Sequence, residues 1–414
     1  YNISKENFWE PLEAYVNDFK LRGSWGSLGN QDVANYSYIP ILPVRTNLGW
    51  IIGSERPVYT QAPGLISTAL TWETATTINI GFDAALVENK LGVTFDWFKR
   101  NTTDMVGPAE SLPNVLGTGV PNTNNAELET KGFELVFSWR DKIGSDFNYN
   151  VKAVLGDNKS TVIKYPNPTN ILSNWYEGEV VGDIWGYETV GYFAEGEDGD
   201  DWYDQSAFYA RWQAGDIKFQ DLNGDEVIDW GDNTVDNPGD MKIIGNNRPR
   251  YNFGVTAGFN FKGFDFNMFW QGIGKRDFSF SSSTNVFWGF RGNKWQNSYY
   301  EEHMDYWSPE NTGAYYPRPY MTGEHTKNTR TQTKYLQNAA YARLKNVQLG
   351  YTLPQSFTNR ISIDKVRFYV TGENLITFTG MTDLFDPEAL GGGWGSGKIY
   401  PLSKLLSMGV NVSF

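Results

Sequence analysis

The chain has 414 residues, a net charge of −13, no cysteine and two histidines, His303 and His325. The acidic balance argues against a nucleic-acid-binding surface, which needs clustered Lys and Arg to neutralise phosphates. The missing cysteines exclude disulfides and Cys-based zinc sites, and two histidines argue against a His-rich metal site or a Ser-His catalytic pair. Aromatic residues make up 16% of the chain, as in the aromatic belts of membrane proteins, but no apolar run is long enough for a transmembrane helix.

Alternation of apolar and polar residues with a period of two predicts about ten β-strands. They are expected, in chain order, at Asp18–Gly26, Thr76–Leu86, Leu91–Arg100, Lys131–Arg140, Phe147–Leu155, Tyr251–Phe261, Phe264–Trp270, Ala339–Leu353, Lys365–Asn374 and Leu405–Phe414. The last strand carries an apolar stripe that runs to the terminal Phe414, a pattern typical of a strand with one face in lipid. The alternation loses its phase around Tyr341–Lys345, where a β-bulge is expected.

The connections between these strands alternate between short and long, as in transmembrane barrels with short periplasmic turns and long outer loops. The longest outer loop is expected at residues 156–250. Polar residues on the opposite face, such as Asp96, Lys152, Asn260 and Asn267, would line the lumen. A soluble β-sandwich also has alternating strands, but connections of this length are uncommon there. The favoured fold is therefore all-β, and residues 1–414 would form the C-terminal part of a large transmembrane β-barrel.

An acidic stretch in the longest loop has the ligand spacing of a calcium-binding loop. The expected ligands are Asp221, Asn223, Asp225, the carbonyl of Val227, Asp229 and Asp232. Two departures weaken the match, because Glu226 replaces the usual glycine and Asp232 replaces the longer Glu. The alternative is a solvated acidic loop without a metal. The spacing favours a structural Ca²⁺ that orders the loop.

Tryptophans are frequent in the outer loops, where their rings could contact a substrate or a partner. The candidates are Trp175, Trp185, Trp202, Trp212, Trp288 and Trp295. The alternative, favoured for most of the loop aromatics, is that they form small cores within the loops. Paired carboxylates such as Asp200/Asp201 have no recognisable catalytic context, so an enzyme is not expected.

Several stretches taken together resemble the SusC/RagA family, the TonB-dependent outer-membrane transporters of Bacteroidetes. They are Leu21–Gln31, Lys131–Leu135, Asp221–Asp232, Tyr341–Pro354, Val366–Leu375, Asp386–Glu388 and Tyr400–Lys404. This resemblance implies a barrel in outer-membrane lipid, a plug-bearing N-terminal part and a SusD-like surface lipoprotein as partners. It also implies TonB-dependent import of oligosaccharides or peptides, with the TonB complex contacted through that N-terminal part.

The plug domain has no counterpart in this chain, so we expect the chain to be a fragment of the transporter. The alternative function is a passive outer-membrane pore or a surface adhesin built on a complete small barrel. A secreted calcium-binding β-protein is a further alternative, and it would be soluble without detergent.

Overall fold

The computed structural model describes residues 1–31, 39–46, 51–67, 70–108, 120–289, 299–390 and 399–414. One antiparallel sheet of 11 strands dominates the fold, with ten strands in a continuous path and β18 paired to β16. In path order they are β1 (Val16–Asn30), β4 (Glu73–Leu86), β5 (Leu91–Gly107), β6 (Thr123–Ile143), β7 (Phe147–Lys164), β12 (Arg250–Phe261), β13 (Phe264–Lys275), β16 (Tyr341–Thr352), β17 (Lys365–Glu373) and β19 (Leu405–Ser413). The ten predicted strands and the all-β fold class are therefore confirmed.

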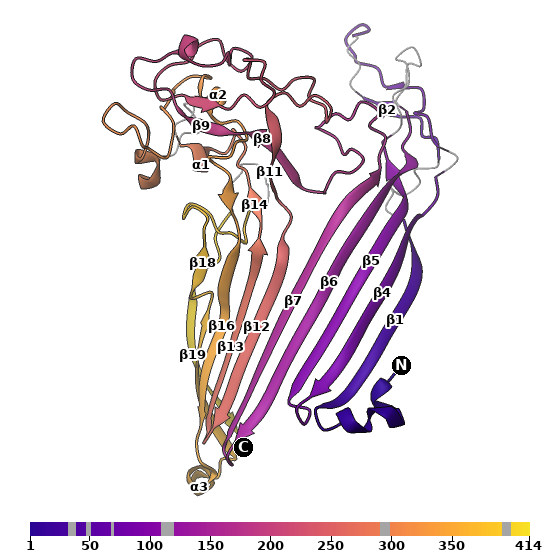
Figure 1. Cartoon of the computed structure of the whole chain (residues 1–414), viewed down its shortest axis with the longest axis vertical. Coiled ribbons are helices and arrows are strands. Elements are labelled where there is room, and N and C mark those ends of the chain that lie inside the picture. The colour runs from indigo at the N-terminus through magenta and orange to yellow at the C-terminus, as the bar shows by residue number, and fades with distance from the viewer. Residues whose placement is uncertain (32–38, 47–50, 68–69, 109–119, 290–298, 391–398) are drawn as a thin grey trace.

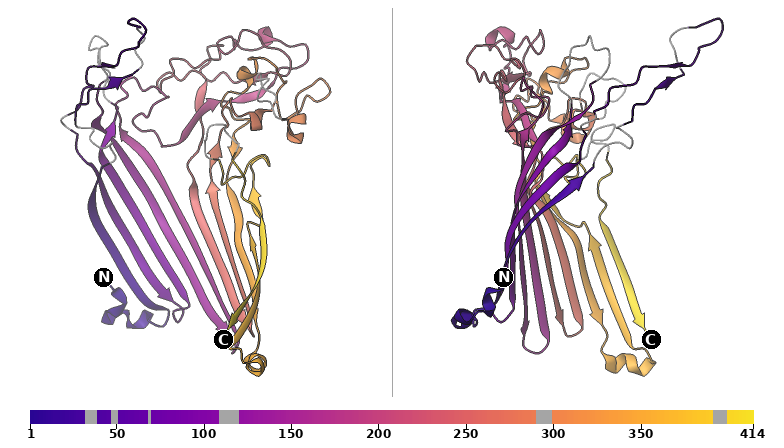
Figure 2. Two further views of the ribbon diagram at one scale, coloured as in Figure 1. Left: turned by 180° about the vertical axis from the view of Figure 1, so that it is seen from behind. Right: turned by 90° about the vertical axis from the view of Figure 1, so that its right-hand side faces the viewer.

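The strands are long and tilted, and the sheet they form is twisted and curved (Figure 2). Short connections lie at one end of the strands together with both chain termini, and long loops lie at the other end (Figure 1). β1 and β19 stand at the two ends of the path and do not pair with each other, so the sheet is open. None of the helices in the described part of the chain has the length and apolarity needed to cross a membrane.

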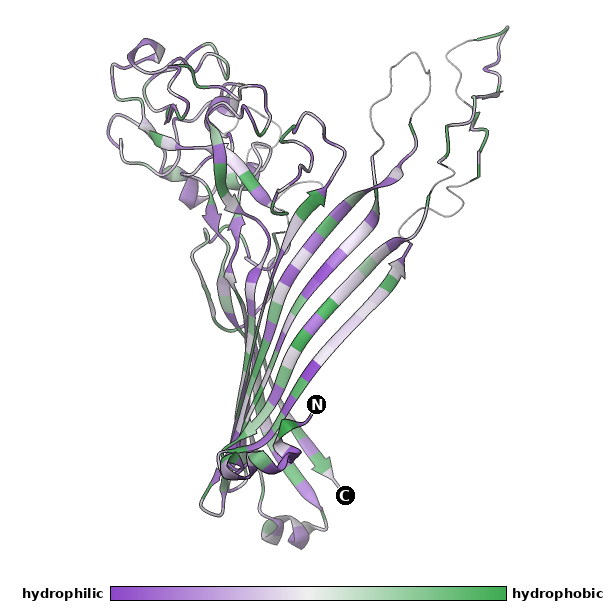
Figure 3. Cartoon of the chain, turned by 45° about the vertical axis from the view of Figure 1, so that its right-hand side comes forward, coloured by the Kyte–Doolittle hydropathy of each residue, from purple (hydrophilic) through white to green (hydrophobic). Residues whose placement is uncertain are grey.

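Hydrophobic and hydrophilic residues alternate along many of the strands (Figure 3), and the strand register gathers the two kinds on opposite faces of the sheet. Ile80 lies opposite Trp97, and Phe82 lies opposite Phe95, on the same face. Large apolar side chains on this face are open to the surroundings, with Ile80 58% and Met408 86% exposed. Such exposure is expected where the face contacts lipid instead of water. The register places the predicted lumen residues Asp96, Lys152, Asn260 and Asn267 together on the other face.

Most strands before β16 extend further toward the loop end than their alternation predicts. Beyond the apolar stretch, the lipid-side positions of β5 and β6 carry charges, and Lys99 and Lys131 both pair with Glu129 at 2.6 and 2.5 Å. Polar residues at these positions end the period-two pattern while the backbone ladder continues. β7 likewise continues to Lys164, so the longest loop comprises residues 165–249 instead of 156–250.

Turns and the bulge follow from local backbone geometry. The β12–β13 turn places Lys262 and Gly263 at φ of 45° and 88°, the left-handed values that a two-residue hairpin requires. The register between β13 and β16 shifts between Phe269 and Trp270, whose partners are Asn346 and Leu344, so Lys345 is left as the expected bulge.

The long loops carry short elements of their own. The strands there are β2 (Val44–Arg45), β3 (Tyr59–Thr60), β8 (Asp183–Tyr187), β9 (Thr189–Tyr192), β10 (Ile217–Phe219), β11 (Met241–Asn246), β14 (Asp277–Phe278), β15 (Gln337–Asn338) and β18 (Thr377–Thr379). The helices are α1 (Asn285–Trp288) and α2 (His325–Asn328), with η4 (Gly199–Asp201) and η5 (Glu301–Met304). At the opposite end of the sheet lie η1 (Ile3–Lys5), η2 (Asn7–Leu12), α3 (Gln355–Thr358) and η6 (Asn359–Ile361).

Candidate functional site

The polar face of the sheet carries ion pairs that cross from strand to strand. Arg22 on β1 reaches Asp83 on β4 at 2.9 Å and Asp96 on β5 at 2.7 Å. One guanidinium thus holds two carboxylates on the two following strands. The face that the alternation predicts to line the lumen therefore carries a charged group that links three neighbouring strands.

A second group of the same kind lies near the opposite edge of the sheet, on β13, β16 and β17. Arg367 on β17 donates to Asp265 on β13 and to Gln348 on β16, the latter at 2.9 Å. Gln348 in turn donates to Thr371 at 2.9 Å. Such charge-assisted bonds across three strands stabilise the register of the sheet.

The described parts of the outer loops between β7 and β12 and between β13 and β16 pack together into a single unit, called here the loop body (residues 165–249, 276–289 and 299–340). An apolar cluster fills it, including Phe193, Trp212, Phe219, Phe287, Trp288 and Tyr335. Phe193, Phe219 and Phe287 are completely buried. Members come from both loops and, with Met381 and Leu390, from the segment after β18, so these loops share one apolar core.

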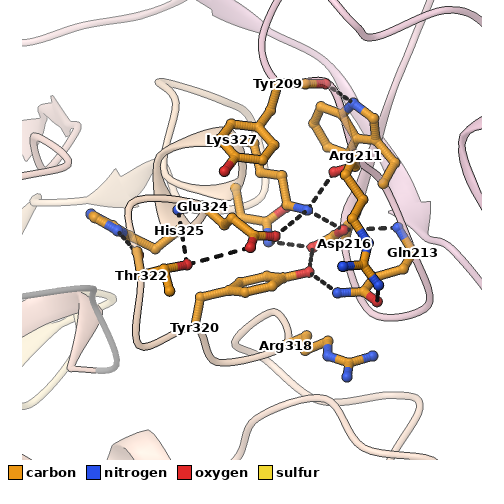
Figure 4. Close-up of polar contacts among 12 residues, drawn as sticks. Tyr209, Arg211, Gln213, Asp216, Arg318, Tyr320, Thr322, Glu324, His325 and Lys327 are labelled. Carbon is orange, nitrogen blue, oxygen red and sulfur yellow. Dashed lines mark hydrogen bonds and ion pairs between the residues drawn. The ribbon is translucent and has the colours of Figure 1, made fainter.

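Buried polar contacts join the two loops next to this cluster (Figure 4). Lys327 forms an ion pair with Asp216 at 2.6 Å, and neither side chain is exposed. The Tyr320 hydroxyl donates to Asp216 at 2.8 Å, and the amide nitrogen of Asn328 donates to it at the same distance. The Lys327 ammonium also donates to the Arg211 carbonyl at 2.7 Å and lies 4.6 Å from the centre of the Tyr320 ring. Burial and the Asp216 carboxylate raise the pKa of Tyr320 above its usual range.

The predicted calcium loop lies at the surface of the loop body, and its carboxylates mostly accept backbone N–H groups. Asp221 accepts from Gly224 at 2.6 Å and from Glu226 at 3.1 Å, and Asp225 accepts from Val227 at 2.8 Å. Asp229 accepts from Gly231 at 2.7 Å. Asn223 donates to Asp225, and Asn237 donates to Asp232, each at 2.9 Å.

The metal-binding capacity of this loop follows from its donor atoms and their arrangement. Carboxylate, amide and carbonyl oxygens are the ligands that a hard cation such as Ca²⁺ prefers. Buried Asp240 accepts from Leu222 and Asp229, and burial and the nearby Asp221 and Asp225 raise its pKa. Within the described residues, however, no three or more His, Cys, Asp or Glu side chains are grouped so as to hold a metal ion. The donor chemistry fits calcium, whereas binding would require these side chains to converge.

The six candidate tryptophans occupy different environments. Trp212 and Trp288 are buried in the apolar cluster, and Trp202 packs against it. Trp175 lines a pocket of about 460 Å³ next to the loop-end segments of β7 and β12, and Trp185 lines a second pocket within the loop body. Trp295 lies outside the described residues. The residues that join the two loops, above all Asp216 and Lys327, were not predicted, because nothing in the local sequence marks them as partners.

Comparison with known proteins identifies the family to which this chain belongs. The family model "TonB dependent receptor-like, beta-barrel" matches residues 9–215, half of the chain. TonB-dependent receptor P3 of Formosa agariphila is 28% identical over 441 residues, covering 100% of this chain and 41% of that protein. TonB-dependent receptor SusC of Bacteroides thetaiotaomicron is 23% identical over 435 residues, covering 100% of this chain and 39% of that protein. The chain thus spans about two fifths of the length of these curated relatives.

Solved structures show the same fold. The RagAB peptide transporter matches with a TM-score of 0.74 at 22% identity, over 100% of this chain and 42% of that chain. The RagAB peptide importer in its open-open state matches with a TM-score of 0.76 at 21% identity and the same coverage. Members of the matched family are receptors and transporters, which confirms that an enzyme is not to be expected here. The chain therefore belongs to the TonB-dependent receptor-like β-barrel family of the outer membrane, as its resemblance to SusC/RagA sequences indicates.

Proposed function

We propose that this chain forms the C-terminal barrel part of an outer-membrane importer that takes up oligosaccharides or peptides. Uptake would be driven by the TonB complex through a plug-bearing N-terminal part, and a SusD-like surface lipoprotein would act as partner. The relatives support this proposal, because they include SusC and the RagAB peptide transporter.

The open sheet is the observation that carries the proposal. β1 and β19 end the continuous path of ten strands, and among the described residues their outer edges have no strand partner apart from a short bridge between Asn2 and Lys20 of β1. An unpaired backbone group in lipid costs several kcal/mol, so these edges require further strands. A passive pore or adhesin made of this chain alone would instead pair β1 with β19. The free edges therefore favour a larger barrel of the importer type.

The loop body supports a role in substrate capture. It joins the two longest outer loops around a buried ion pair, so it presents a preorganised surface at the loop end of the sheet (Figure 1). A preorganised surface binds a ligand or a partner with a smaller loss of conformational entropy.

Uptake in the source bacterium tests the proposal. Cells that carry the complete transporter should accumulate labelled oligosaccharide or peptide, and deletion of tonB should abolish accumulation. A lipoprotein should co-purify with the transporter in detergent. Uptake that is unchanged without TonB would instead establish the passive pore.

We also propose that the Asp221–Asp232 loop binds a structural Ca²⁺ through Asp221, Asn223, Asp225, Val227, Asp229 and Asp232. The oxygen donors and their spacing support this assignment. A bound cation would balance the acidic charge gathered in this loop and around Asp240, and it would order the chain there.

A further inference from the structure

An open pocket with a volume of about 570 Å³ lies between the two loops of the loop body. Its lining includes Trp185 and Tyr187 of β8, Trp230, Ser282, Thr329 and Arg330. The volume is within the range of pockets that bind small ligands, about 300–1,000 Å³. We call it the Arg330 pocket.

Arg330 brings to this pocket a positive charge that has no carboxylate partner among the described residues. Its guanidinium stacks on Phe208, 3.8 Å from the ring centre, and lies 5.9 Å from the Trp230 ring centre. Its Nε atom is buried without a hydrogen-bond partner among the described residues. Burial lowers the pKa of Arg330. The Tyr187 hydroxyl partly offsets this lowering. A guanidinium that is largely buried normally forms an ion pair with an anionic group.

Thr329 adds a second unsatisfied polar group at the same wall. The residue is 4% exposed, and its hydroxyl has no hydrogen-bond partner among the described residues. Buried polar side chains in native proteins almost always have a partner. Two neighbouring residues thus leave polar atoms unsatisfied in the wall of one pocket.

The backbone that carries these groups is held firmly. The Tyr187 N–H donates to the Thr331 carbonyl and the Thr333 N–H donates to the Tyr187 carbonyl, both at 3.0 Å. On the other side, Asn328 is tied to Asp216 at 2.8 Å. The pocket wall is thus preorganised, which reduces the cost of binding.

We propose that the Arg330 pocket binds an acidic saccharide, whose carboxylate pairs with the Arg330 guanidinium and whose ring stacks on Trp230. Trp230 is 43% exposed, so part of its ring is available for such a contact. The proposal rests on the proposed import function and narrows its substrate class.

A saccharide suits this pocket better than a peptide. Peptides are commonly bound by backbone pairing along a free strand edge. Here the edge of β8 at Tyr187 is already paired with Thr331 and Thr333. The remaining lining offers hydroxyls, an amide and aromatic faces, which match ring hydroxyls and the apolar faces of sugars.

Calorimetric titration of the complete, detergent-solubilised transporter tests this inference. The probes are tetragalacturonate, the same oligomer with its carboxyl groups reduced to alcohols, and a tetraglutamate peptide. Tetragalacturonate should bind most tightly, and Arg330→Gln should weaken its binding roughly ten- to a hundred-fold, the loss expected for a charged hydrogen bond. Arg211→Gln, which removes an exposed arginine of the same loop body, should leave binding unchanged.

Equal binding of the charged and reduced oligomers would overturn the inference, as would unchanged binding in Arg330→Gln or preference for the peptide. Should Arg330→Gln fail to fold, Trp230→Leu provides a second test, because loss of the exposed ring should weaken tetragalacturonate binding. Binding is measured without TonB, so this inference can fail while TonB-dependent uptake of another substrate holds.

Discussion

Lys327 and Asp216 form an ion pair of 2.6 Å in which neither side chain is exposed to solvent. The two residues come from different outer loops, so their contact is a bond between loops and not within one. The hydroxyl of Tyr320, the side-chain amide of Asn328 and the backbone N–H of Gln213 also donate to the carboxylate. This pair couples the two halves of the loop body.

Replacing Lys327 by Met should destabilise the loop body by about 3–5 kcal/mol, because it leaves the buried Asp216 carboxylate without a counter-charge. Hydrogen–deuterium exchange in detergent should report faster exchange in both loops. The control is Lys242→Met, whose partner Glu188 is 42% exposed. That variant should cost less than about 1 kcal/mol. Equal effects would contradict the coupling role of the buried pair.

Removing calcium should loosen the acidic loop if it holds the proposed ion. EGTA should increase proteolysis between residues 217 and 240, and added Ca²⁺ should reverse this effect. The variant with Asp221→Ala and Asp225→Ala should be cleaved equally with and without chelator. Asp200→Ala with Asp201→Ala serves as the control for lost acidic charge and should keep the response. A wild-type chain indifferent to chelator would refute the metal site.

Acidification should weaken the packing around His303. Its Nδ1 accepts the Tyr300 N–H at 3.0 Å, so Nε2 carries the proton and donates to the carbonyls of Val286 and Phe287. Burial lowers the pKa of His303 below its ordinary value of 6.5. Between the pKa values of the two states, His303 binds a proton in the unfolded chain but not in the folded chain. The stability that neutral His303 contributes is therefore complete above about pH 6.5 and is lost as the pH falls toward the pKa of His303 in the folded chain.

This pH dependence can be measured by exchange at residues 281–289 and 299–316 between pH 8 and 5. His303→Gln should flatten the profile, whereas His325→Gln, which alters the other histidine of the chain, should not. A profile unaffected by His303→Gln would assign the effect to another group.

Removing Arg22 should weaken the pairing of β1, β4 and β5. Arg22→Met leaves Asp83 and Asp96 facing each other without a cation, and because the groups are partly exposed we expect a cost of about 1 kcal/mol. A lower thermal unfolding temperature in detergent would show it. Lys152→Met, on the same face, is the control, since no ion pair of Lys152 occurs among the described residues.

Arginine scanning should distinguish the two faces of β4. Ile80→Arg places a charge on the lipid side and should cost about 2–4 kcal/mol near the bilayer midplane. Asn79→Arg places it on the opposite face and should be tolerated. Folding yield into liposomes measures both. A greater loss for Asn79→Arg would reverse the assignment of the faces.

The bulge and the strand ends show which features of the fold the local sequence pattern can predict and which it cannot. The loss of phase at Tyr341–Lys345 predicted the bulge that the structure places at Lys345. The outer ends of most strands were predicted too short, because charges such as Lys99 and Lys131 break the alternation while hydrogen bonding between strands continues. The predicted loop at residues 156–250 began too early for the same reason.

The sequence by itself determined the strands, their two faces and the short turns. Residues along each strand face lipid and lumen in turn, so apolar and polar residues must alternate. Only the tertiary structure decided which loop residues meet: Asp216 with Lys327, and Arg330 with Phe208. Contacts between separate loops obey no period, since each depends on where two distant segments pack. The aromatic richness of the loops predicted that small cores would form there, whereas the buried charges and the pocket between the loops exist only once both loops are folded together.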